Sequence, residues 1–458
     1  MTSRQNNLFQ VKPQRLVRRD FLRLGGLALG GLTLPNLLQA TAGKGAHTSL
    51  ILVFCWGGPS HLETYDLKPE GPENSRSVFK PIPTAVPGMS ICEHLPLQAA
   101  QASRFSLIRS LRHKINIHND GSILTLTGKE PSVLDPTSTS KSEHPDLGMI
   151  VGHLRGPHPR ALPQYVSIPN NFHMTRVNYL GPGCQGFATG DVSTPGYQPG
   201  FLSLRGMDIQ SLSARRSLLG RLDQWRGEMN QAPARQGMGV FQNQAMDVLT
   251  SPEVARAFQL HREPEILRDR YGRHLWGQGC LLARRLAEAG VAVTSVTFDS
   301  PKSGPDYTNW DDHPGNAMRP GHFGDYMKRR LPFFDQALSA LISDLFERGL
   351  DRKVMVAVIG EFGRTPQIRK GPPDNSIGRD HWPDAYSALI SGGGLRMGQV
   401  VGSTNARGEY PKETPLGPQD VLATLYRHLG IDPEQHLNDK QGKPVPILPT
   451  GKPIAALV

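Results

Sequence analysis

The sequence predicts an α/β protein with a predominantly parallel central sheet and helices on both faces, and three segments carry this prediction. Residues 49–56 (SLILVFCW) and 354–360 (VMVAVIG) are continuous apolar runs, typical of strands that are buried on both faces of a sheet. Residues 330–349 read as a helix between the strand-like runs 291–299 and 354–360. A strand, helix, strand order with short connections is a parallel unit by default.

Further elements follow in chain order. Residues 97–111 read as a helix that runs into a strand. A second helix is expected to begin near Asn119 or Asp120, because both residue types commonly cap helix N-termini. Residues 418–432 read as an amphipathic helix that ends at Gly430, a residue type that favours the helix C-terminus.

Composition suggests how the chain is divided. Residues 130–208 are dense in Pro, Gly, Ser and Thr and predict a loop-rich insertion with short strands, such as 164–168 (QYVSI). Residues 209–290 have apolar positions three or four apart and predict a helical segment. We therefore expect a single α/β domain over residues 43–458, preceded by a signal at 1–42.

The first 42 residues predict export. Residues 17–24 read VRRDFLRL, and the apolar stretch 25–40 and small residues follow, with a predicted cleavage after Ala42. This order is typical of a twin-arginine signal. The bland alternative is an amphipathic basic tail. If the signal is used, the protein interacts with the twin-arginine translocation machinery and is exported to the periplasm, the cell envelope or the medium. The apolar stretch is short and rich in glycine, so no stable membrane span is expected.

Net charge argues against a nucleic-acid-binding protein. The whole chain carries a net charge of +11. Residues 1–42 hold six basic side chains and one acidic side chain, so the chain after Ala42 carries only +6. No basic stripe is interleaved with aromatic residues, which nucleic-acid binding would require. A mild positive excess is compatible with anionic substrates.

The cysteines exclude a zinc ribbon and a thiol-redox motif, because no two of them form a CxxC pair. One or two disulfides are compatible with an oxidising envelope. Cys55 ends an apolar run and is expected to be a buried small hydrophobe. The four are Cys55, Cys92, Cys184 and Cys280.

Acid and imidazole side chains gather in three short segments beside strand-like runs. Side chains at the carboxyl ends of neighbouring strands converge on one crevice in an α/β sheet. Imidazole and carboxylate together suit one or two divalent ions such as zinc, whereas calcium would favour carboxylates and carbonyls alone. The alternatives are a capped turn for the first segment and a structural Asp–His hydrogen bond for the last. The candidate metal ligands are Asp311 with Asp312 and His313, then Glu361, then Asp380 and His381.

Several motifs in a fixed order resemble a known family. They are LVFCWGGPSHLETYDLKP, HNDGSILTLTG, NWDDH, GEFGRTP and GRDHWP. With the twin-arginine signal, they resemble the exported domain-of-unknown-function family 1501 of planctomycetes, which is similar to the alkaline phosphatase and sulfatase superfamily. The resemblance covers essentially the whole chain after the signal. It implies an alkaline phosphatase-like fold, but the family has no defined reaction.

The resemblance implies a metal site with two departures from the superfamily pattern. Asp311, His313 and His381 match metal ligands, with Asp380 as a ligand or as an orienting group. Glu361 stands where the superfamily has an Asp followed by His, and Phe362 replaces that His. The first strand lacks its usual Asp. Gly57 and Gly58 stand there instead, which leaves His61 or Asp66 as substitutes.

The resemblance also implies a nucleophile at a helix N-terminus, near His118 or Ser122, ahead of Thr127 and Gly128. Strict spacing favours His118. Arg364 would clamp an anionic group through its planar guanidinium, or would instead pair with Glu361 or Asp380. His118 or His381 would move protons.

Two function classes remain open. The first is an exported metal-dependent hydrolase of phosphate or sulfate esters, with an anionic ester substrate such as an esterified polysaccharide. The second is a non-catalytic member of the superfamily that acts as a binding or scaffold protein in the cell envelope. The missing first-strand Asp and the unclear nucleophile favour the second class.

Overall fold

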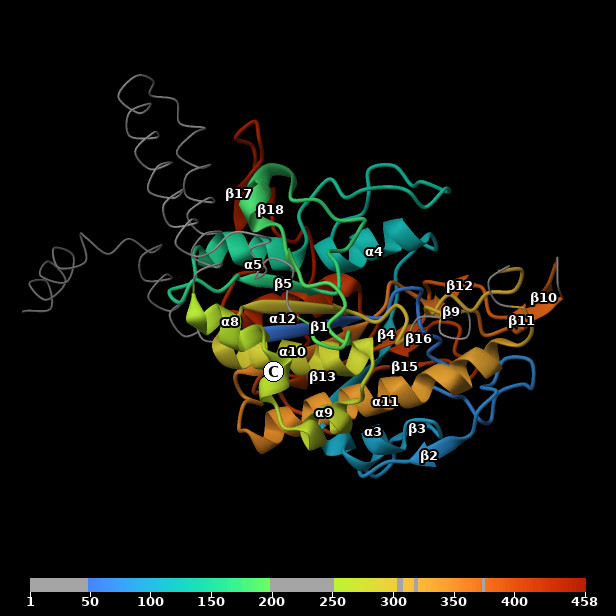
Figure 1. The fold of residues 1–458 in the computed structure, drawn as a ribbon. Helices are drawn as coiled ribbons and strands as arrows, with labels where there is room; N and C mark the ends of the chain where they lie inside the picture. The colour runs from blue at the N-terminus through green and yellow to red at the C-terminus, as the bar shows by residue number, and fades with distance from the viewer. Residues whose placement is uncertain (1–47, 198–250, 303–307, 317–319, 373–374) are drawn as a thin grey trace, which may run out of the picture. The chain divides into compact units, whose positions relative to one another are not determined.

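A computed structural model describes residues 48–197, 251–302, 308–316, 320–372 and 375–458. Its main feature is an eight-stranded sheet in the order β14-β4-β13-β8-β1-β7-β5-β6 (Figure 1). These strands are β1 (Ser49–Phe54), β4 (Phe105–Leu111), β5 (Tyr165–Ile168), β6 (Phe187–Ala188), β7 (Val293–Thr297), β8 (Val354–Ile359), β13 (Tyr386–Gly392) and β14 (Val400–Val401).

The sheet is mostly parallel, as predicted. β1 lies between β7 and β8 and is parallel to both, with Leu50 opposite Val293 on one side and Met355 on the other. β5 continues the parallel order beyond β7. β13 alone is antiparallel to its neighbours, β4 and β8. The amino end of β13 therefore lies at the same sheet edge as the carboxyl ends of the parallel strands.

Five two-stranded sheets and several helices complete the described part of the chain. The small sheets pair β2 (Pro81–Pro83) with β3 (Ser90–Cys92), β9 (Gly363–Arg364) with β12 (His381–Trp382), β10 (Arg369–Gly371) with β11 (Ser376–Gly378), β15 (Ser403–Thr404) with β16 (Pro411–Glu413), and β17 (His436–Asn438) with β18 (Pro444–Pro446). The α-helices are α3 (Pro96–Ala100), α4 (His118–Thr127), α5 (Leu147–Arg155), α8 (Pro252–Phe258), α9 (Glu265–Tyr271), α10 (Leu275–Ala289), α11 (Phe323–Glu347) and α12 (Pro418–His428).

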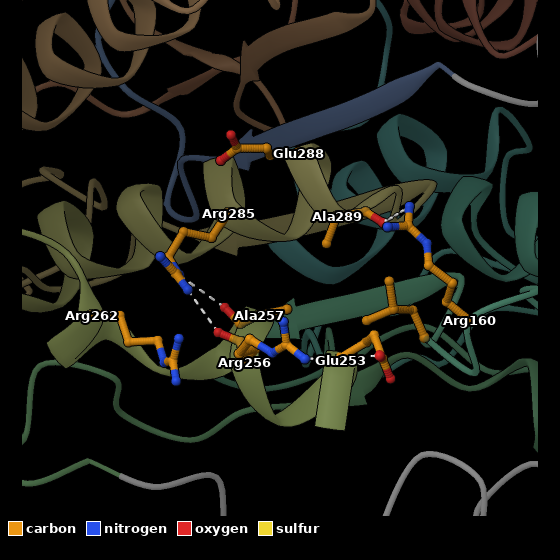
Figure 2. Close-up of a pocket in the computed structure, with 9 residues that line it drawn as sticks. Arg160, Glu253, Arg256, Ala257, Arg262, Arg285, Glu288 and Ala289 are labelled. Atoms are coloured by element: carbon orange, nitrogen blue, oxygen red, sulfur yellow. Dashed lines mark hydrogen bonds and ion pairs between the residues drawn. The ribbon is translucent and has the colours of Figure 1, made fainter. Parts of the chain in front are cut away.

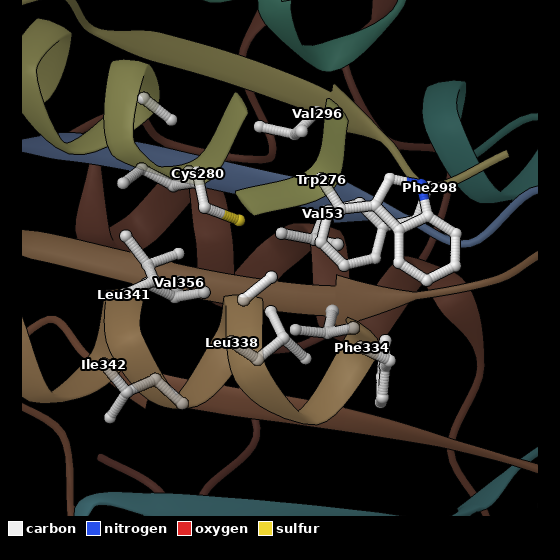
Figure 3. Packing of buried hydrophobic residues seen from close by; sticks show 14 of the residues in the cluster. Val53, Trp276, Cys280, Val296, Phe298, Phe334, Leu338, Leu341, Ile342 and Val356 are labelled. Atoms are coloured by element: carbon white, nitrogen blue, oxygen red, sulfur yellow. The ribbon is translucent and has the colours of Figure 1, made fainter. Parts of the chain in front are cut away.

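Helices cover both faces of the sheet, and alternate residues of each strand enter two separate cores. On one face, Val53 of β1 and Val356 of β8 pack in a cluster with Trp276 of α10 and Leu338 of α11 (Figure 3). Leu52 and its alternate neighbours join the opposite core, which α4, α5 and α12 supply. Each fully buried aliphatic side chain contributes about 1.5–3 kcal/mol to folding. Burial on both faces explains why these strands are continuously apolar in sequence.

The helix ends differ slightly from the sequence expectations. α4 begins at His118, next to the expected Asn119 or Asp120, but neither of these caps it, because the N-cap position is Ile117. The Asp120 carboxylate instead accepts a hydrogen bond from the backbone N–H of Asp135, 2.7 Å away, and so anchors a loop. α12 ends as expected. Gly430 has a φ of 73°, and the next N–H donates back to the carbonyl of Tyr426, which is typical of a helix terminated by glycine.

The loop-rich segment contributes more to the sheet than its composition predicts. β5 and β6 lie within residues 130–208, yet both belong to the central sheet. From residue 251 onward the predicted helical segment contains α8, α9 and α10. Residues 209–250 and the proposed signal at 1–42 lie outside the described residues, so those parts of the prediction stay untested.

Two smaller expectations concern the cysteines and the membrane. All four cysteines are buried free thiols, so the structure contains neither of the disulfides that an envelope would allow. Cys55 is packed in the core as a small apolar residue, as expected. Among the described helices, none combines the length and the apolar character that a membrane span needs.

Candidate metal centre at the carboxyl edge of the sheet

Four chain segments bring acid and imidazole side chains to one edge of the sheet. His118 is the first residue of α4, which follows β4, and Glu361 comes two residues after β8. Asp311 and His313 lie in the loop that follows β7. His381 lies in β12 and precedes β13. It reaches the same edge because β13 is antiparallel, although the sequence places it before a strand rather than after one.

The carboxylate of Asp311 is the centre of this cluster. Its Oδ1 lies 3.2 Å from Nε2 of His118 and 3.1 Å from Nε2 of His381. Its Oδ2 lies 3.3 Å from Nε2 of His313. Ligand atoms of His118, Asp311 and His381 all lie within 4.8 Å of one another. A common point is therefore within reach of several side chains that are far apart in sequence.

The other ring nitrogen of each histidine contacts a hydrogen-bond acceptor. Nδ1 of His381 lies 2.8 Å from the carbonyl of Asn116, and Nδ1 of His313 lies 2.9 Å from the carbonyl of Pro314. A carbonyl only accepts, so both histidines carry a proton on Nδ1. Nδ1 of His118 lies 2.7 Å from Oε1 of Glu361. The Nε2 atoms are thus left for the cluster, which is the usual arrangement of metal-binding histidines.

This geometry fits a divalent cation. Lone pairs on neutral Nε2 atoms would face the lone pairs of the Asp311 carboxylate, and the two repel each other unless a proton or a cation lies between them. Imidazole nitrogen and carboxylate oxygen are common zinc ligands. His118, Asp311 and His381 would hold the ion, and His313, which contacts the other carboxylate oxygen of Asp311, would add a fourth ligand.

Glu361 orients the centre through a hydrogen bond to His118. Its side chain is fully buried, and Oε1 accepts hydrogen bonds from His118 and from the backbone N–H of Gly57, 2.8 Å away. Its Oε2 is buried and has no hydrogen-bond partner among the described residues. A buried carboxylate oxygen left in this state is costly. A cation or proton near Oε2 would offset that cost.

Arg364 holds the Asp311 loop rather than facing solvent. Its guanidinium is fully buried and donates to Oδ1 of Asp311 at 2.9 Å and to the carbonyl of Trp310 at 3.1 Å. It also donates to the carbonyls of Gly57 and Gly58. The predicted clamp on a substrate anion is not what this geometry provides, because the group is enclosed by the protein's own carbonyls.

Charges in the cluster shift the pKa of His118 and Asp311 in opposite directions. Burial alone would lower the pKa of His118, but hydrogen bonds with Asp311 and Glu361 outweigh it and raise the pKa to about 9. Burial would raise the pKa of Asp311, yet Arg364 and the surrounding imidazoles hold it well below its usual range. Asp311 is therefore ionised throughout the physiological pH range.

The two other histidines differ from each other. The hydrogen bond with Asp311 raises the pKa of His313. Burial lowers the pKa of His381, and its contact with Asp311 offsets this only partly. His381 is thus the imidazole that is most readily available as a neutral ligand.

Other predicted ligands lie outside the cluster. His61 is buried, and its Nε2 lies 2.9 Å from the carbonyl of Gly408. Asp380, the residue before β12, forms an ion pair with Arg369 instead, and both side chains are partly exposed.

The remaining candidates have structural contacts. Asp312 forms a buried ion pair with Arg330, and Asp66 pairs with Lys68 at 2.9 Å. Ser122 lies one turn into α4 and is fully buried, so its hydroxyl does not reach the cleft as a nucleophile would.

Aromatic residues that sequence reasoning did not assign form the walls of the centre. The ring of Phe362 stacks on His381 with centroids 4.7 Å apart, and lies 5.1 Å from the ring of His118. Trp56 lies 5.8 Å from His118 and 5.2 Å from His173. The motif GEFGRTP contains Phe362, which the sequence alone identifies only as the replacement of a histidine. Its ring in fact packs against two histidines of the centre.

A cleft of about 660 Å³ adjoins the centre at Trp56. Its other walls come from residues 169–174 after β5, from residues 273–275 and from residues 297–302 after β7. Clefts of this size bind small molecules.

A smaller hollow of about 390 Å³ lies beside α8 and α10 (Figure 2). Four arginines line it, and two of them donate hydrogen bonds to backbone carbonyls. Arg285 donates to the carbonyls of Ala257 and Arg256 at 3.0 and 2.7 Å, and Arg160 donates to the carbonyl of Ala289. No histidine is among the described residues that line this hollow, so it lacks the combination of imidazole and carboxylate side chains that makes up the centre.

The fold and the cluster define an α/β protein with a histidine–carboxylate centre at the carboxyl edge of its sheet. The chain belongs to the family described as "Protein of unknown function (DUF1501)", which matches residues 47–458. This confirms the family resemblance. A search of curated proteins found no match.

Solved structures with low similarity include hydrolases and a synthase. The lipoteichoic acid synthase LtaP from Listeria monocytogenes is 12% identical, with a TM-score of 0.34 over 90% of this chain and 80% of that one. The phosphonate monoester hydrolase of Agrobacterium radiobacter is 13% identical, with a TM-score of 0.39 over 89% and 78%. The PsFucS1 sulfatase from Pseudoalteromonas sp. is 10% identical, with a TM-score of 0.38 over 86% and 72%.

Proposed function

We propose that the protein is a metal-dependent hydrolase of phosphate or sulfate esters, with one zinc-like ion bound by His118, Asp311, His313 and His381. The observation that carries the proposal is the common orientation of the three imidazoles. Each has Nδ1 at a hydrogen-bond acceptor and Nε2 at the Asp311 carboxylate. A purely structural cluster would not need three rings with the same nitrogen directed inward.

The protein's own residues would prepare the site for hydrolysis. Glu361 orients His118, and Arg364 holds the Asp311 carboxylate in place. Phe362 and Trp56 shield the imidazoles from bulk water, which strengthens electrostatic interactions in the site. When bound, a divalent ion supplies Lewis acidity toward an ester oxygen and activates water.

Water is the proposed attacking group. Ser122 is enclosed in α4 and is not available, and His118 is engaged on both ring nitrogens. Because His118 and His381 would both be bound to the ion, the predicted proton transfer by either of them is not part of this proposal, and a second water would carry the proton to the leaving oxygen.

Export through the twin-arginine route remains part of the proposal. It rests on the VRRDFLRL sequence and the apolar stretch after it. A chain folded before transport would acquire its metal in the cytoplasm. The predicted destination is the periplasm, the cell envelope or the medium.

A non-catalytic binding protein is the second candidate, and one observation favours it. Gly57 and Gly58 follow β1 where a carboxylate would be needed, so this strand brings no carboxylate to the centre, and one ion rather than two is what the cluster would hold. Such a protein would hold one metal or none and would act as a binding or scaffold protein that cleaves no ester.

The test is a metal-reconstitution assay. The full chain is treated with a chelator, reloaded with zinc or manganese, and assayed with 4-nitrophenyl phosphate and 4-nitrophenyl sulfate. We expect turnover of at least one ester that depends on the metal and is lost in Asp311→Asn, while Asp380→Asn, outside the cluster, retains it. Stoichiometric metal without turnover of either ester would favour the binding protein, and no retained metal would refute the hydrolase and favour a scaffold without metal.

A further inference from the structure

The cleft beside the centre lies along the same sheet edge. The centre receives its side chains from segments next to β4, β7, β8 and β13, and the cleft is built at the ends of β1, β5 and β7. β1 is the neighbour of β8 in the sheet, so Trp56, just after β1, stands where the two meet. Ligands of open α/β sheets bind in such a crevice outside the carboxyl ends of the strands.

Direct contacts join the cleft to the centre. The ring of Trp56 packs between those of His118 and His173, with centroids 5.8 and 5.2 Å away. Nε2 of His173 lies 3.1 Å from Oδ1 of Asn119, the residue after His118. A molecule whose ester group lies at the centre would therefore extend over Trp56 and His173 into the cleft.

The lining combines an aromatic face with uncharged hydrogen-bonding groups. Trp56 is half-buried and presents part of its indole, while Asn170, Asn171, Ser193 and Thr297 supply amide and hydroxyl groups. Each of these groups both donates and accepts, as a sugar hydroxyl does. An aromatic face packs against the apolar face of a pyranose ring.

The charges of the cleft are balanced and largely engaged. Two acidic residues, Asp191 and Asp299, and two basic residues, Arg273 and Lys302, line the cleft. Arg273 is paired with Asp269, and the ammonium of Lys302 lies 4.7 Å from the centroid of the Phe333 ring. A polyanion would meet as many acids as bases here, so the cleft favours a neutral group.

We propose that this cleft binds the saccharide portion of the substrate, a neutral, hydroxyl-rich alcohol whose phosphate or sulfate ester lies at the centre. The ester part of this statement rests on the proposed function, whereas saccharide binding by the cleft does not. An alkyl alcohol would leave the amide groups of the lining without hydrogen-bond partners, and a polyanion would be repelled by Asp191 and Asp299.

Binding is tested first, without hydrolysis. The native chain is mixed with maltose or cellobiose, which carry no phosphate or sulfate ester to hydrolyse, and saturation-transfer NMR and titration measure binding. We expect binding of at least one disaccharide. Asn170→Ala, a change at an exposed position, should weaken it about three- to tenfold, as the loss of one hydrogen bond predicts. Asn438→Ala, a matched exposed change in β17, should leave it unchanged.

Hydrolysis is tested next in the zinc-loaded native chain. We expect kcat/KM for glucose 6-sulfate or glucose 6-phosphate to exceed that for the matching hexyl ester by about tenfold or more, since a site built for hydroxyl groups rejects analogues without them. Disaccharide binding without turnover of any ester would retain the cleft and refute the hydrolase. Absence of disaccharide binding, or a preference for the hexyl ester, would overturn the saccharide proposal.

Discussion

Nδ1 of His118 lies 2.7 Å from Oε1 of Glu361, and this contact directs the opposite nitrogen of the ring toward Asp311. Glu361 is fully buried, so its negative charge acts on the imidazole with little screening. The pair has the form of a carboxylate that orients a metal-binding histidine and increases its basicity.

Glu361→Gln should weaken zinc binding without abolishing it. The amide retains an oxygen for His118 Nδ1 and Gly57 N–H but loses the charge behind the ring. Changes to such supporting groups weaken metal affinity by about 10- to 100-fold. Competition with a fluorescent zinc chelator measures the change. Unaltered affinity in a folded Glu361→Gln protein would mean that His118 is not a ligand.

Asp311→Asn should remove the metal from the protein, because Asp311 is the group that contacts all three imidazoles. Elemental analysis after purification and dialysis measures the metal content per chain. Asp380→Asn is the matched control, since Asp380 lies close in sequence to His381 but pairs with Arg369 at the surface. Equal metal content in the two variants would contradict the assignment of the centre.

Much of the fold follows from local sequence, and part of the site does not. The strands β1 and β8 are predictable because burial on both faces makes them continuous apolar runs. The helix α11 between β7 and β8 is predictable from its apolar positions three or four residues apart. β13 is also largely buried, but its direction depends on which strands it pairs with. That direction places His381, which precedes β13, at the same sheet edge as the other side chains of the centre.

Residue type alone does not separate ligands from buried structural groups. Asp311 and Asp312 are neighbours, yet one faces the imidazoles and the other pairs with Arg330. Similarly, His61 follows a conspicuous GGPS motif but contacts the carbonyl of Gly408. Only the directions of the side chains, set by loop backbone that no periodicity describes, distinguish these cases.

Zinc affinity should rise with pH. Without metal, the pKa of His118 is raised to about 9, so this imidazole is protonated at neutral pH and must release its proton to bind an ion. Displacing one proton makes the affinity increase about tenfold per pH unit below that pKa. Calorimetric titrations at pH 6 to 8, in buffers of different ionisation enthalpy, measure both the affinity and the proton release. A flat affinity over this range would contradict protonated His118.

Arg364→Lys should destabilise the protein markedly. The guanidinium donates to carbonyls on two loops and to Asp311, all buried, and an ammonium cannot reproduce this planar set of contacts. Breaking a buried charged pair costs about 3–5 kcal/mol. Urea unfolding measures the loss. Arg369→Lys, whose side chain is 63% exposed beside Asp380, should change stability by less than about 1 kcal/mol. Similar losses in the two variants would refute the structural role of Arg364.

Gly57→Ala should distort the centre, whereas Gly88→Ala should cost only backbone strain. Both glycines have positive φ angles, of 110° and 79°, which L-residues disfavour by roughly 1–2 kcal/mol. A Cβ on Gly57 would lie 2.5 Å from the backbone nitrogen of Asp311, while one on Gly88 would meet no atom within 4 Å.

The pair therefore separates strain from displacement of Asp311. We expect Gly57→Ala to lose about 2–5 kcal/mol of stability, since overpacking adds to the strain, and to bind zinc more weakly. Gly88→Ala should lose about 1–2 kcal/mol and retain its zinc affinity. Urea unfolding of the metal-free proteins and zinc competition measure the two quantities. If Gly57→Ala keeps native zinc affinity, the position of the Asp311 loop does not govern metal binding, and the centre must tolerate movement of its central carboxylate.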